Sequence, residues 1–172
     1  MDNKVINSLP IFKSFKPNQI EKIKPLMEFC SFPADMVIFQ QGDRAENFYI
    51  LTSGEIALHF KPYDGPSLVI TKISSGKVFG WSAALNRPTY NAAAVTINKI
   101  TAIRMKASKL KTLCATDPDT ASLFLNSLVE VISDNLNVSH QEILNLLSQG
   151  MNLNGDCGRR MDSDGNENRI YA

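Results

Sequence analysis

The pattern that most limits how this chain can fold is a change in its hydrophobic period at about residue 28 and again at about residue 106. Between these positions, short segments rich in β-branched and aromatic residues alternate with clusters of Gly, Pro, Asn, Asp and Ser, as strands alternate with turns. The segments that this pattern predicts as strands are 28–32, 36–40, 47–52, 55–60, 67–73, 91–97 and 99–105. So many short strands at close spacing predict an all-β sandwich, roll or barrel.

Helical periodicity flanks this β region on both sides. Residues 4–28 show it in short pieces, in which apolar side chains recur at intervals of three and four residues. After the β region, residues 109–116 read as a short helix. Pro118 then stands near the first position of a longer helix, where proline is favoured. A further single helical turn is expected at residues 81–85, which interrupt the run of strands.

Residues 118–149 are expected to form one long helix with an apolar stripe. The stripe includes Leu125, Leu128, Ile132, Leu136 and Ile143. As a helix, residues 120–148 would span roughly 44 Å, which exceeds the width of a small β core. Pairing with the same helix of a second copy would bury the remainder, so a homodimer is expected. Packing of the stripe against the chain's own β region is the alternative.

Composition limits the classes of partner. The chain has 172 residues, and its 18 Lys and Arg against 17 Asp and Glu give a formal net charge of +1, which provides no electrostatic reason to expect binding to nucleic acid or membranes. No apolar run approaches the roughly 18 residues of a membrane-spanning helix, and the N-terminus lacks the apolar core of a secretory signal. A cytoplasmic protein is expected. Residues 150–172 are polar and are expected to form a flexible tail.

Cysteine and histidine are too sparse to predict a disulfide framework or a metal site. Cys30, Cys114 and Cys157 are odd in number and far apart in the sequence, which favours free thiols in a reducing compartment. His59 and His140 fall on different predicted elements, without a convergent carboxylate. No metal and no cofactor is therefore expected, and a haem with either histidine as axial ligand is the alternative left open.

Two glycine-anchored stretches resemble a known family. Residues 39–56, FQQGDRAENFYILTSGEI, resemble the first half of the cyclic nucleotide-binding domain, and residues 76–80, GKVFG, resemble the lead into its phosphate-binding cassette. The resemblance is particularly to the branch of catabolite activators and fumarate-nitrate regulators. It implies a mainly β fold, a jelly-roll-like β roll flanked by N-terminal helices and a long C-terminal helix. The corresponding domain is 1–149, with the roll at about 28–106 and the long helix at about 118–149.

Two glycines within the first stretch also have a local physical role. Gly42 and Gly54 lie between apolar strand segments. A turn at such a place requires a positive φ or a close approach of two backbones, and glycine allows both. Glycine has no side chain with which to contact a ligand, so these two residues are expected to shape the roll.

The phosphate-binding cassette departs from the family pattern at both of its charged positions. The resemblance implies Gly followed by a Glu that binds the ribose, and about ten residues later an Arg that binds the phosphate, followed by small residues. Here Gly80 matches, but Trp81 stands in place of the Glu. Asn91 stands in place of the Arg, and Ala92 and Ala93 match the small residues.

These two replacements are large in free energy. A hydrogen bond to a charged group contributes roughly 1.5–3 kcal/mol. The loss of two such bonds would weaken binding by about two to four powers of ten, because about 1.4 kcal/mol corresponds to a factor of ten. Weak or absent binding of cAMP and cGMP is therefore expected, and a different small ligand is the candidate.

The cassette still offers groups that could hold a ligand. The candidate ligand-binding residues are Phe79, Gly80, Trp81, Ser82, Ala83, Arg87, Asn91, Ala92 and Ala93. Arg87 could bring a guanidinium to an anion from a different direction than the family's Arg. Ser82 and nearby backbone N–H groups could hold a phosphate or a carboxylate. Trp81 and Tyr90 could line a site for an aromatic ligand.

The expected function is a non-catalytic sensory or regulatory module that binds a small ligand, a nucleotide or another anion. One alternative is a structural dimerisation module whose pocket is filled by Trp81. Another is the ligand-sensing fragment of a transcription regulator. Transcription regulators of this family carry a helix-turn-helix after the long helix, and residues 150–172 lack the apolar content for one, so no DNA binding by this chain alone is expected. The sequence contains no nucleophile–base set and no P-loop, so an enzyme is not expected.

Overall fold

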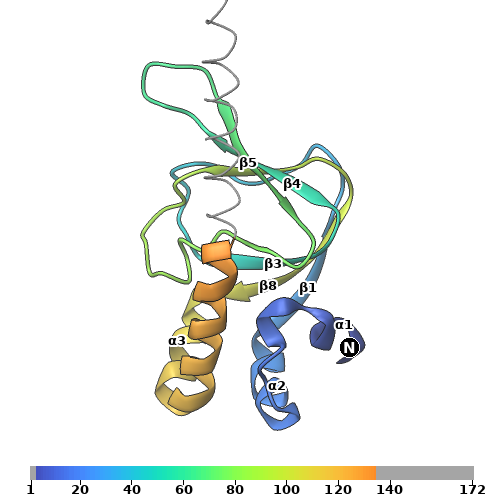
Figure 1. Cartoon of the computed structure of the whole chain (residues 1–172). Coiled ribbons are helices and arrows are strands. Elements are labelled where there is room, and N and C mark those ends of the chain that lie inside the picture. The colour runs from blue at the N-terminus through green and yellow to red at the C-terminus, as the bar shows by residue number, and fades with distance from the viewer. Residues whose placement is uncertain (1–2, 135–172) are drawn as a thin grey trace, which may run out of the picture. The chain divides into compact units, whose positions relative to one another are not determined.

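The β region is built from eight strands, described by a computed structural model that covers residues 3–134 (Figure 1). The strands are β1 (Met27–Phe32), β2 (Val37–Phe39), β3 (Asn47–Ser53), β4 (Glu55–Phe60), β5 (Leu68–Ser74), β6 (Val78–Phe79), β7 (Ala93–Thr96) and β8 (Ile100–Lys106). They form two four-stranded antiparallel sheets, in the orders β1-β8-β3-β6 and β2-β7-β4-β5. This architecture confirms the prediction of a mainly β roll.

The strands predicted from the sequence all occur, and each begins and ends within two residues of its predicted bounds. β6 was not predicted, because two residues are too few to show an alternation of buried and exposed positions. Residues 81–86 form a series of turns, in which the N–H of Leu85 donates to the carbonyl oxygen of Trp81 at 3.0 Å, the spacing of one helical turn.

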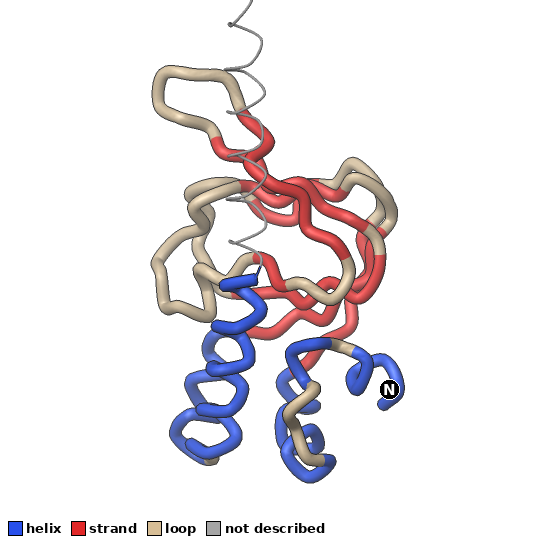
Figure 2. Tube along the Cα trace, viewed as in Figure 1, coloured by secondary structure: helices blue, strands red, loops and turns tan. Residues whose placement is uncertain are grey.

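Helices flank the strands in the sequence and lie outside the roll in space (Figure 2). They are α1 (Asn3–Ser8), the 3-10 helices η1 (Pro10–Phe12) and η2 (Lys24–Leu26), α2 (Pro17–Ile23) and α3 (Ala107–Thr116). A further helix begins at residue 118 and is described as far as residue 134. The remainder of the expected long helix, residues 135–149, and the expected tail, 150–172, lie outside the described residues.

β3 is buried on both faces and joins the inside of the roll to the helices. All four side chains of residues 48–51 are buried. Successive side chains of a strand point to opposite faces. Phe48 accordingly lies toward the helices, with its ring centroid 6.1 Å from that of Phe124, whereas Tyr49 lies inside the roll, where it stacks 4.8 Å from Phe79. The sheet therefore has one aromatic core on each side.

The N-terminal helices and helix 118–134 share the outer core. The ring of Phe124 lies 6.1 Å from that of Phe12 and 6.5 Å from that of Phe15, as measured between centroids. Phe124 is completely buried. This contact between segments more than 100 residues apart holds both ends of the described chain against the same face of the roll.

Asp117 begins helix 118–134 by capping it. Its carboxylate accepts hydrogen bonds from the backbone N–H and the hydroxyl of Thr120, at 3.2 and 3.0 Å. The same carboxylate forms an ion pair with Lys22 at the end of α2. The hydrogen bond from Lys22, followed by that from the Thr120 N–H, holds the pKa of Asp117 below its usual value. One side chain therefore both starts this helix and connects it to the N-terminal helices.

Candidate functional site

The cassette expected to hold a ligand is a tight turn closed by its own backbone. It starts at Gly80, where φ is +70°, and a Cβ at this position would lie 3.1 Å from the carbonyl oxygen of Asn47. It ends where the N–H of Arg87 donates to the carbonyl oxygen of Ser82 at 2.9 Å. Asn86 also has a positive φ, +56°. A side chain at residue 80 would therefore be both strained and crowded, which explains why glycine occupies it.

A cavity of about 300 Å³ lies beside this turn, and we call it the cassette cavity. Its lining comes from the turn and from β2, β4 and β5: Phe39, Leu58, Phe60, Ile70, Gly80, Trp81, Ser82, Leu85, Arg87, Tyr90, Asn91 and Ala92. Sites for small molecules occupy about 300–1,000 Å³ and are mostly apolar with a few polar groups. The cassette cavity has this composition and lies at the small end of the range.

Six of the nine residues proposed from the sequence line the cassette cavity, namely Gly80, Trp81, Ser82, Arg87, Asn91 and Ala92. The other three lie elsewhere. Phe79 is buried in the roll against Tyr49, Ala83 is buried and lines a different cavity, and Ala93 is buried in β7. None of these three residues lines the cassette cavity.

The apolar wall of the cavity was not predicted from the sequence. It consists of Phe39, Leu58, Phe60, Ile70 and Leu85. Two of its members, Leu58 and Phe60, alternate along β4, and this alternation is a signal that the sequence contains. Tyr90 was considered as a lining residue, and it stacks on Phe39 with ring centroids 3.8 Å apart.

Arg87 carries the only charged side chain among the residues that line the cassette cavity. The guanidinium is exposed, and no carboxylate of the described residues forms an ion pair with it. Burial raises the pKa of Tyr90, so its phenol is neutral near pH 7. The electrostatic character of the cavity is therefore positive, and an anion is the complementary ligand.

Two backbone N–H groups add to this character. The N–H groups of Trp81 and Ser82, at the start of the turn, donate no hydrogen bond to any other backbone group of residues 3–134. Such N–H groups at the first positions of a helical turn are free to bind an acceptor. Trp81 itself is half-buried against the core, so the indole forms part of the wall.

The residues proposed for a dimer helix divide into two groups. Leu128 and Ile132 are buried in the core of this chain, at 1% and 7% exposure, whereas Leu125 is half-buried. Leu136 and Ile143 lie outside the described residues. In the described part of this helix, Val129 is a large apolar side chain that is 55% exposed. The chain's own core therefore accounts for part of the stripe, as the alternative reading of the sequence expected.

The described part of the chain contains neither a candidate metal cluster nor a helix that could span a membrane. Across residues 3–134, no group of three or more His, Cys, Asp and Glu side chains could hold a metal ion. Cys30 and Cys114 are free thiols, and His140 and Cys157 lie outside the described residues. No helix within 3–134 has the length and apolar character needed to cross a membrane.

The chain is similar in sequence to one protein family and to a known regulator. The sequence model of the cyclic nucleotide-binding domain family matches residues 29–117, more than half of the chain. A CRP-like cAMP-activated global transcriptional regulator of Mycobacterium tuberculosis is 23% identical over 118 residues, which are 69% of this chain and 53% of the regulator. The chain thus spans about half the length of that curated relative.

Solved structures share the fold. A cyclic nucleotide-binding domain from Methylobacillus flagellatus superposes with a TM-score of 0.73 at 18% identity, covering 83% of this chain and 80% of that one. The regulatory subunit of a cAMP-independent protein kinase A from Trypanosoma brucei has a TM-score of 0.64 at 13% identity, covering 84% of this chain and 49% of that one. With its family match over residues 29–117 and this β roll, the chain belongs to the cyclic nucleotide-binding domain family.

Proposed function

We propose that this chain is a regulatory, ligand-sensing module that binds a small aromatic anion in the cassette cavity, in preference to cAMP or cGMP. The observation that carries the proposal is the open volume of about 300 Å³ beside Trp81, lined by one cation and by aromatic and apolar side chains. Membership of a family of regulatory proteins supports sensing rather than catalysis.

The polar groups of the cavity match an anion better than they match a ribose. Trp81 and Asn91, which replace the Glu and the Arg of the family pattern, both line the cavity. The lining contains no carboxylate to accept hydrogen bonds from a ribose hydroxyl. One guanidinium, Arg87, takes the place of the family's phosphate-binding cation, and guanidinium groups pair with carboxylates and phosphates in two-point contacts.

The aromatic preference comes from Trp81 and Tyr90. Both line the cavity, and Tyr90 is held rigidly between Phe39 and the backbone of Asn47. Aromatic faces at fixed positions favour a planar ligand, because ring pairs are stabilised beyond their buried area by about 0.5–1.5 kcal/mol. Phe60, Ile70 and Leu85 extend the apolar wall with surfaces that are still partly exposed, at 39%, 45% and 53%.

The same cavity counts against a purely structural module whose pocket is filled by Trp81. A filled pocket would place the indole in the core without open volume beside it. Instead, Trp81 is half-buried, and about 300 Å³ remains next to it. The match to about half of a longer transcription regulator supports the idea that such a sensing unit works as part of a larger protein.

Dimerisation is proposed through the exposed face of helix 118–134. Val129 is 55% exposed and lies at the edge of the apolar stripe, next to the half-buried Leu125, whereas Leu128 and Ile132 are buried in the core of this chain. Substitution Val129→Glu is expected to shift the protein from dimer to monomer in light scattering after size exclusion, while circular dichroism shows that the fold is retained. Leu128→Ala is the contrasting variant, expected to destabilise the fold by about 2–5 kcal/mol through the cavity it creates. A monomeric native protein would contradict the dimer.

The only tryptophan of the chain provides the test of ligand binding, because Trp81 lines the cavity. The probes are benzoate, 4-hydroxyphenylacetate, cAMP and cGMP, and their binding is followed by the fluorescence of Trp81. Saturable change with an aromatic carboxylate, and weakening of at least tenfold in Arg87→Ala, are expected. Arg44→Ala, another exposed arginine that does not line this cavity, is the matched control. Tight binding of cAMP, or no response to any probe, would contradict the proposal.

A further inference from the structure

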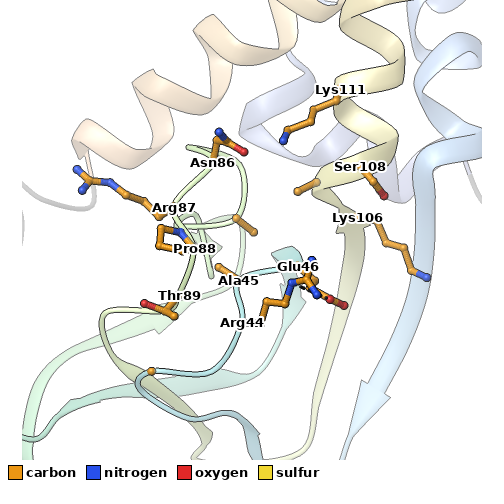
Figure 3. A pocket seen from close by; sticks show the side chains of 13 residues that line it. Arg44, Ala45, Glu46, Asn86, Arg87, Pro88, Thr89, Lys106, Ser108 and Lys111 are labelled. Carbon is orange, nitrogen blue, oxygen red and sulfur yellow. Dashed lines mark ion pairs between the residues drawn. The ribbon is translucent and has the colours of Figure 1, made fainter.

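A second and larger cavity, of about 830 Å³, lies outside the roll, and we call it the outer cavity (Figure 3). Its lining comes from Ala83 and from residues within three segments: 42–46, the end of the cassette at 86–89, and the start of α3 with the residue before it, 106–111. Arg87 is the one residue of these segments that also lines the cassette cavity. The outer cavity is thus a separate concavity on the far side of the cassette.

Backbone hydrogen bonds hold the walls of the outer cavity in place. The N–H of Ala45 donates to the carbonyl oxygen of Pro88 at 3.0 Å, and Arg44 and Thr89 form an antiparallel bridge. On the other side, the N–H of Ala107 donates to the carbonyl oxygen of Glu46 at 2.9 Å. Residues 44–46 are therefore bonded to the cassette and to α3, which fixes the distance between the two walls.

The charges around the outer cavity are unbalanced. Its lining includes four cations, Arg44, Arg87, Lys106 and Lys111, and a single carboxylate, Glu46. Glu46 pairs with Arg44, at 3.4 Å between side-chain nitrogen and oxygen. No side chain of residues 3–134 forms an ion pair with the other three cations. A whole chain of net charge +1 therefore gathers an excess of three positive charges around one cavity.

The side chains differ in how they face this cavity (Figure 3). Lys111 extends from α3 across the opening toward Asn86, and Arg44 lies with Glu46 on the opposite wall. Lys106 and Arg87 point outward at the two ends of the cavity. Lysine and arginine side chains at exposed positions rotate readily, so both can turn toward a bound anion at the cost of side-chain entropy. Lys111 is the cation that the backbone already aims across the opening.

We propose that the outer cavity binds a small molecule with several negative charges, such as a triphosphate or another linear polyphosphate. Several cations around one concavity favour a multiply charged ligand, because each phosphate group can pair with a different side chain. The volume of about 830 Å³ accommodates a ligand longer than the cassette cavity can take. Asn86, Thr89 and Ser108 add neutral groups that can hydrogen-bond to phosphate oxygens.

Arg87 connects this site to the cassette cavity, since it lines both. One guanidinium cannot pair with two anions at separate places at full strength. A polyphosphate in the outer cavity that engages Arg87 therefore weakens the binding of an anion in the cassette cavity, and by linkage the reverse holds to the same extent. This coupling rests on the proposed function, whereas polyphosphate binding at Lys111 does not depend on it.

The test uses the full chain and inorganic tripolyphosphate, titrated by calorimetry at low and moderate salt. We expect saturable binding that weakens with salt and becomes at least tenfold weaker in Lys111→Glu. Lys99→Glu is the matched control, since it makes the same change of charge at an exposed residue outside both cavities. Absence of saturable binding, or equal weakening in the two variants, would overturn the site.

The coupling is tested separately. Tripolyphosphate at saturation is expected to weaken benzoate binding, followed by Trp81 fluorescence, by about the factor that Arg87→Ala causes alone. In Arg87→Ala, tripolyphosphate is expected to have no further effect on benzoate. An effect of equal size in Arg87→Ala would overturn the shared role of Arg87. Because Lys111 lines only the outer cavity, its result stands apart from any failure of the cassette cavity to bind benzoate.

Discussion

The phenol of Tyr90 and the backbone of Asn47 hold each other by two hydrogen bonds. The hydroxyl donates to the carbonyl oxygen of Asn47 at 2.6 Å and accepts from its N–H at 3.1 Å. The same carbonyl oxygen lies 3.1 Å from the position that a Cβ of residue 80 would occupy. Asn47, at the start of β3, therefore contacts the chain on both sides of the cassette turn, at Gly80 where the turn starts and at Tyr90 just after it ends.

This relationship predicts the effect of removing one oxygen atom. Tyr90→Phe retains the ring that stacks on Phe39 but leaves a backbone N–H and a carbonyl oxygen of Asn47 without their partner. The free energy of unfolding, measured with urea, is expected to fall by about 1–3 kcal/mol. Tyr63→Phe makes the same chemical change at a fully exposed residue and is expected to have no effect. Equal stability of the two variants would mean that the hydroxyl of Tyr90 does not hold the cassette.

Two glycines with nearly the same backbone conformation are predicted to respond differently to alanine. Gly42 and Gly54 have φ of +89° and +84°. A Cβ at Gly42 meets nothing within 4 Å, whereas at Gly54 it would lie 2.7 Å from the carbonyl oxygen of Lys99. Gly42→Ala is expected to cost about 1–2 kcal/mol for the left-handed conformation alone. Gly54→Ala adds a clash with backbone and is expected to cost about 3 kcal/mol or more.

Urea unfolding of both glycine variants measures this difference directly. The two substitutions are chemically identical, so each serves as the control for the other. Similar losses of stability would show that the turn between β3 and β4 and residues 98–100 move apart at little cost, which would contradict the close approach at Gly54. A larger loss at Gly42 would contradict the assignment of free space around it.

The turns and strands could be predicted from the sequence because their signals are local. Gly42 and Gly54 separate apolar strand segments. The sequence predicted that a turn there would need either a positive φ or a close approach of two backbones, and both glycines have a positive φ. The strands between them alternate or are rich in β-branched residues, so their bounds follow from a few neighbouring positions. Pro118 likewise marks the first residue of the helix that is described to residue 134.

The place of Ile70 in the apolar wall of the cassette cavity could not be predicted because it depends on a register shift. β4 and β5 pair regularly from Glu55 and Ser74 to Leu58 and Thr71, and then the register shifts, so that His59 lies opposite Val69. Ile70 is thereby left between the paired residues of β5 and lines the cavity. A β-bulge of this kind has no signature in the alternation of a single strand.

What covers the apolar stripe of helix 118–134 also could not be predicted from the sequence. The spacing of Leu125, Leu128 and Ile132 indicates an apolar face but does not say whether the chain itself or a second copy covers it. The answer depends on Phe12 and Phe15, which are more than 100 residues away and bring Phe124 and its neighbours into the chain's own core. Such a long-range contact is not contained in the local pattern.

The ion pair between Lys22 and Asp117 predicts a dependence of stability on acid. The pKa of Asp117 is lowered in the fold, mainly by the hydrogen bond from Lys22, so the folded state holds the ionised form more strongly than the unfolded state does. This stabilisation is fully present above the usual carboxyl pKa of 3.8 and is lost as the pH falls through the lower pKa of the folded state.

Asp117→Asn removes the charge but retains a side-chain oxygen that can cap helix 118–134. The variant is expected to unfold at lower urea concentration than the native chain at about pH 7, with a difference that shrinks as the pH falls below about 4. Asp119→Asn, at an exposed residue of the same helix, is the control and is expected to follow the native chain. A difference that stays constant with pH would show that the charge of Asp117 makes no contribution.

Restoring the two family residues is predicted to restore binding of cAMP. Trp81→Glu supplies a carboxylate for the ribose hydroxyl, and Asn91→Arg supplies a guanidinium for the phosphate; both positions line the cassette cavity. Each recovered hydrogen bond to a charged group contributes roughly 1.5–3 kcal/mol, so the double variant is expected to bind cAMP about two to four powers of ten more tightly in calorimetry.

Removing the indole also enlarges the cassette cavity of about 300 Å³, so the effect of the arginine needs a control. The double variant Trp81→Glu/Asn18→Arg has the same net charge, with its arginine on α2 outside the cavity, and is expected to gain only the contribution of the carboxylate, about one to two powers of ten. If the pair at 81 and 91 fails to gain affinity while the fold is intact, the cavity has changed its shape as well as its charges, and the ligand must be sought among molecules unlike a cyclic nucleotide.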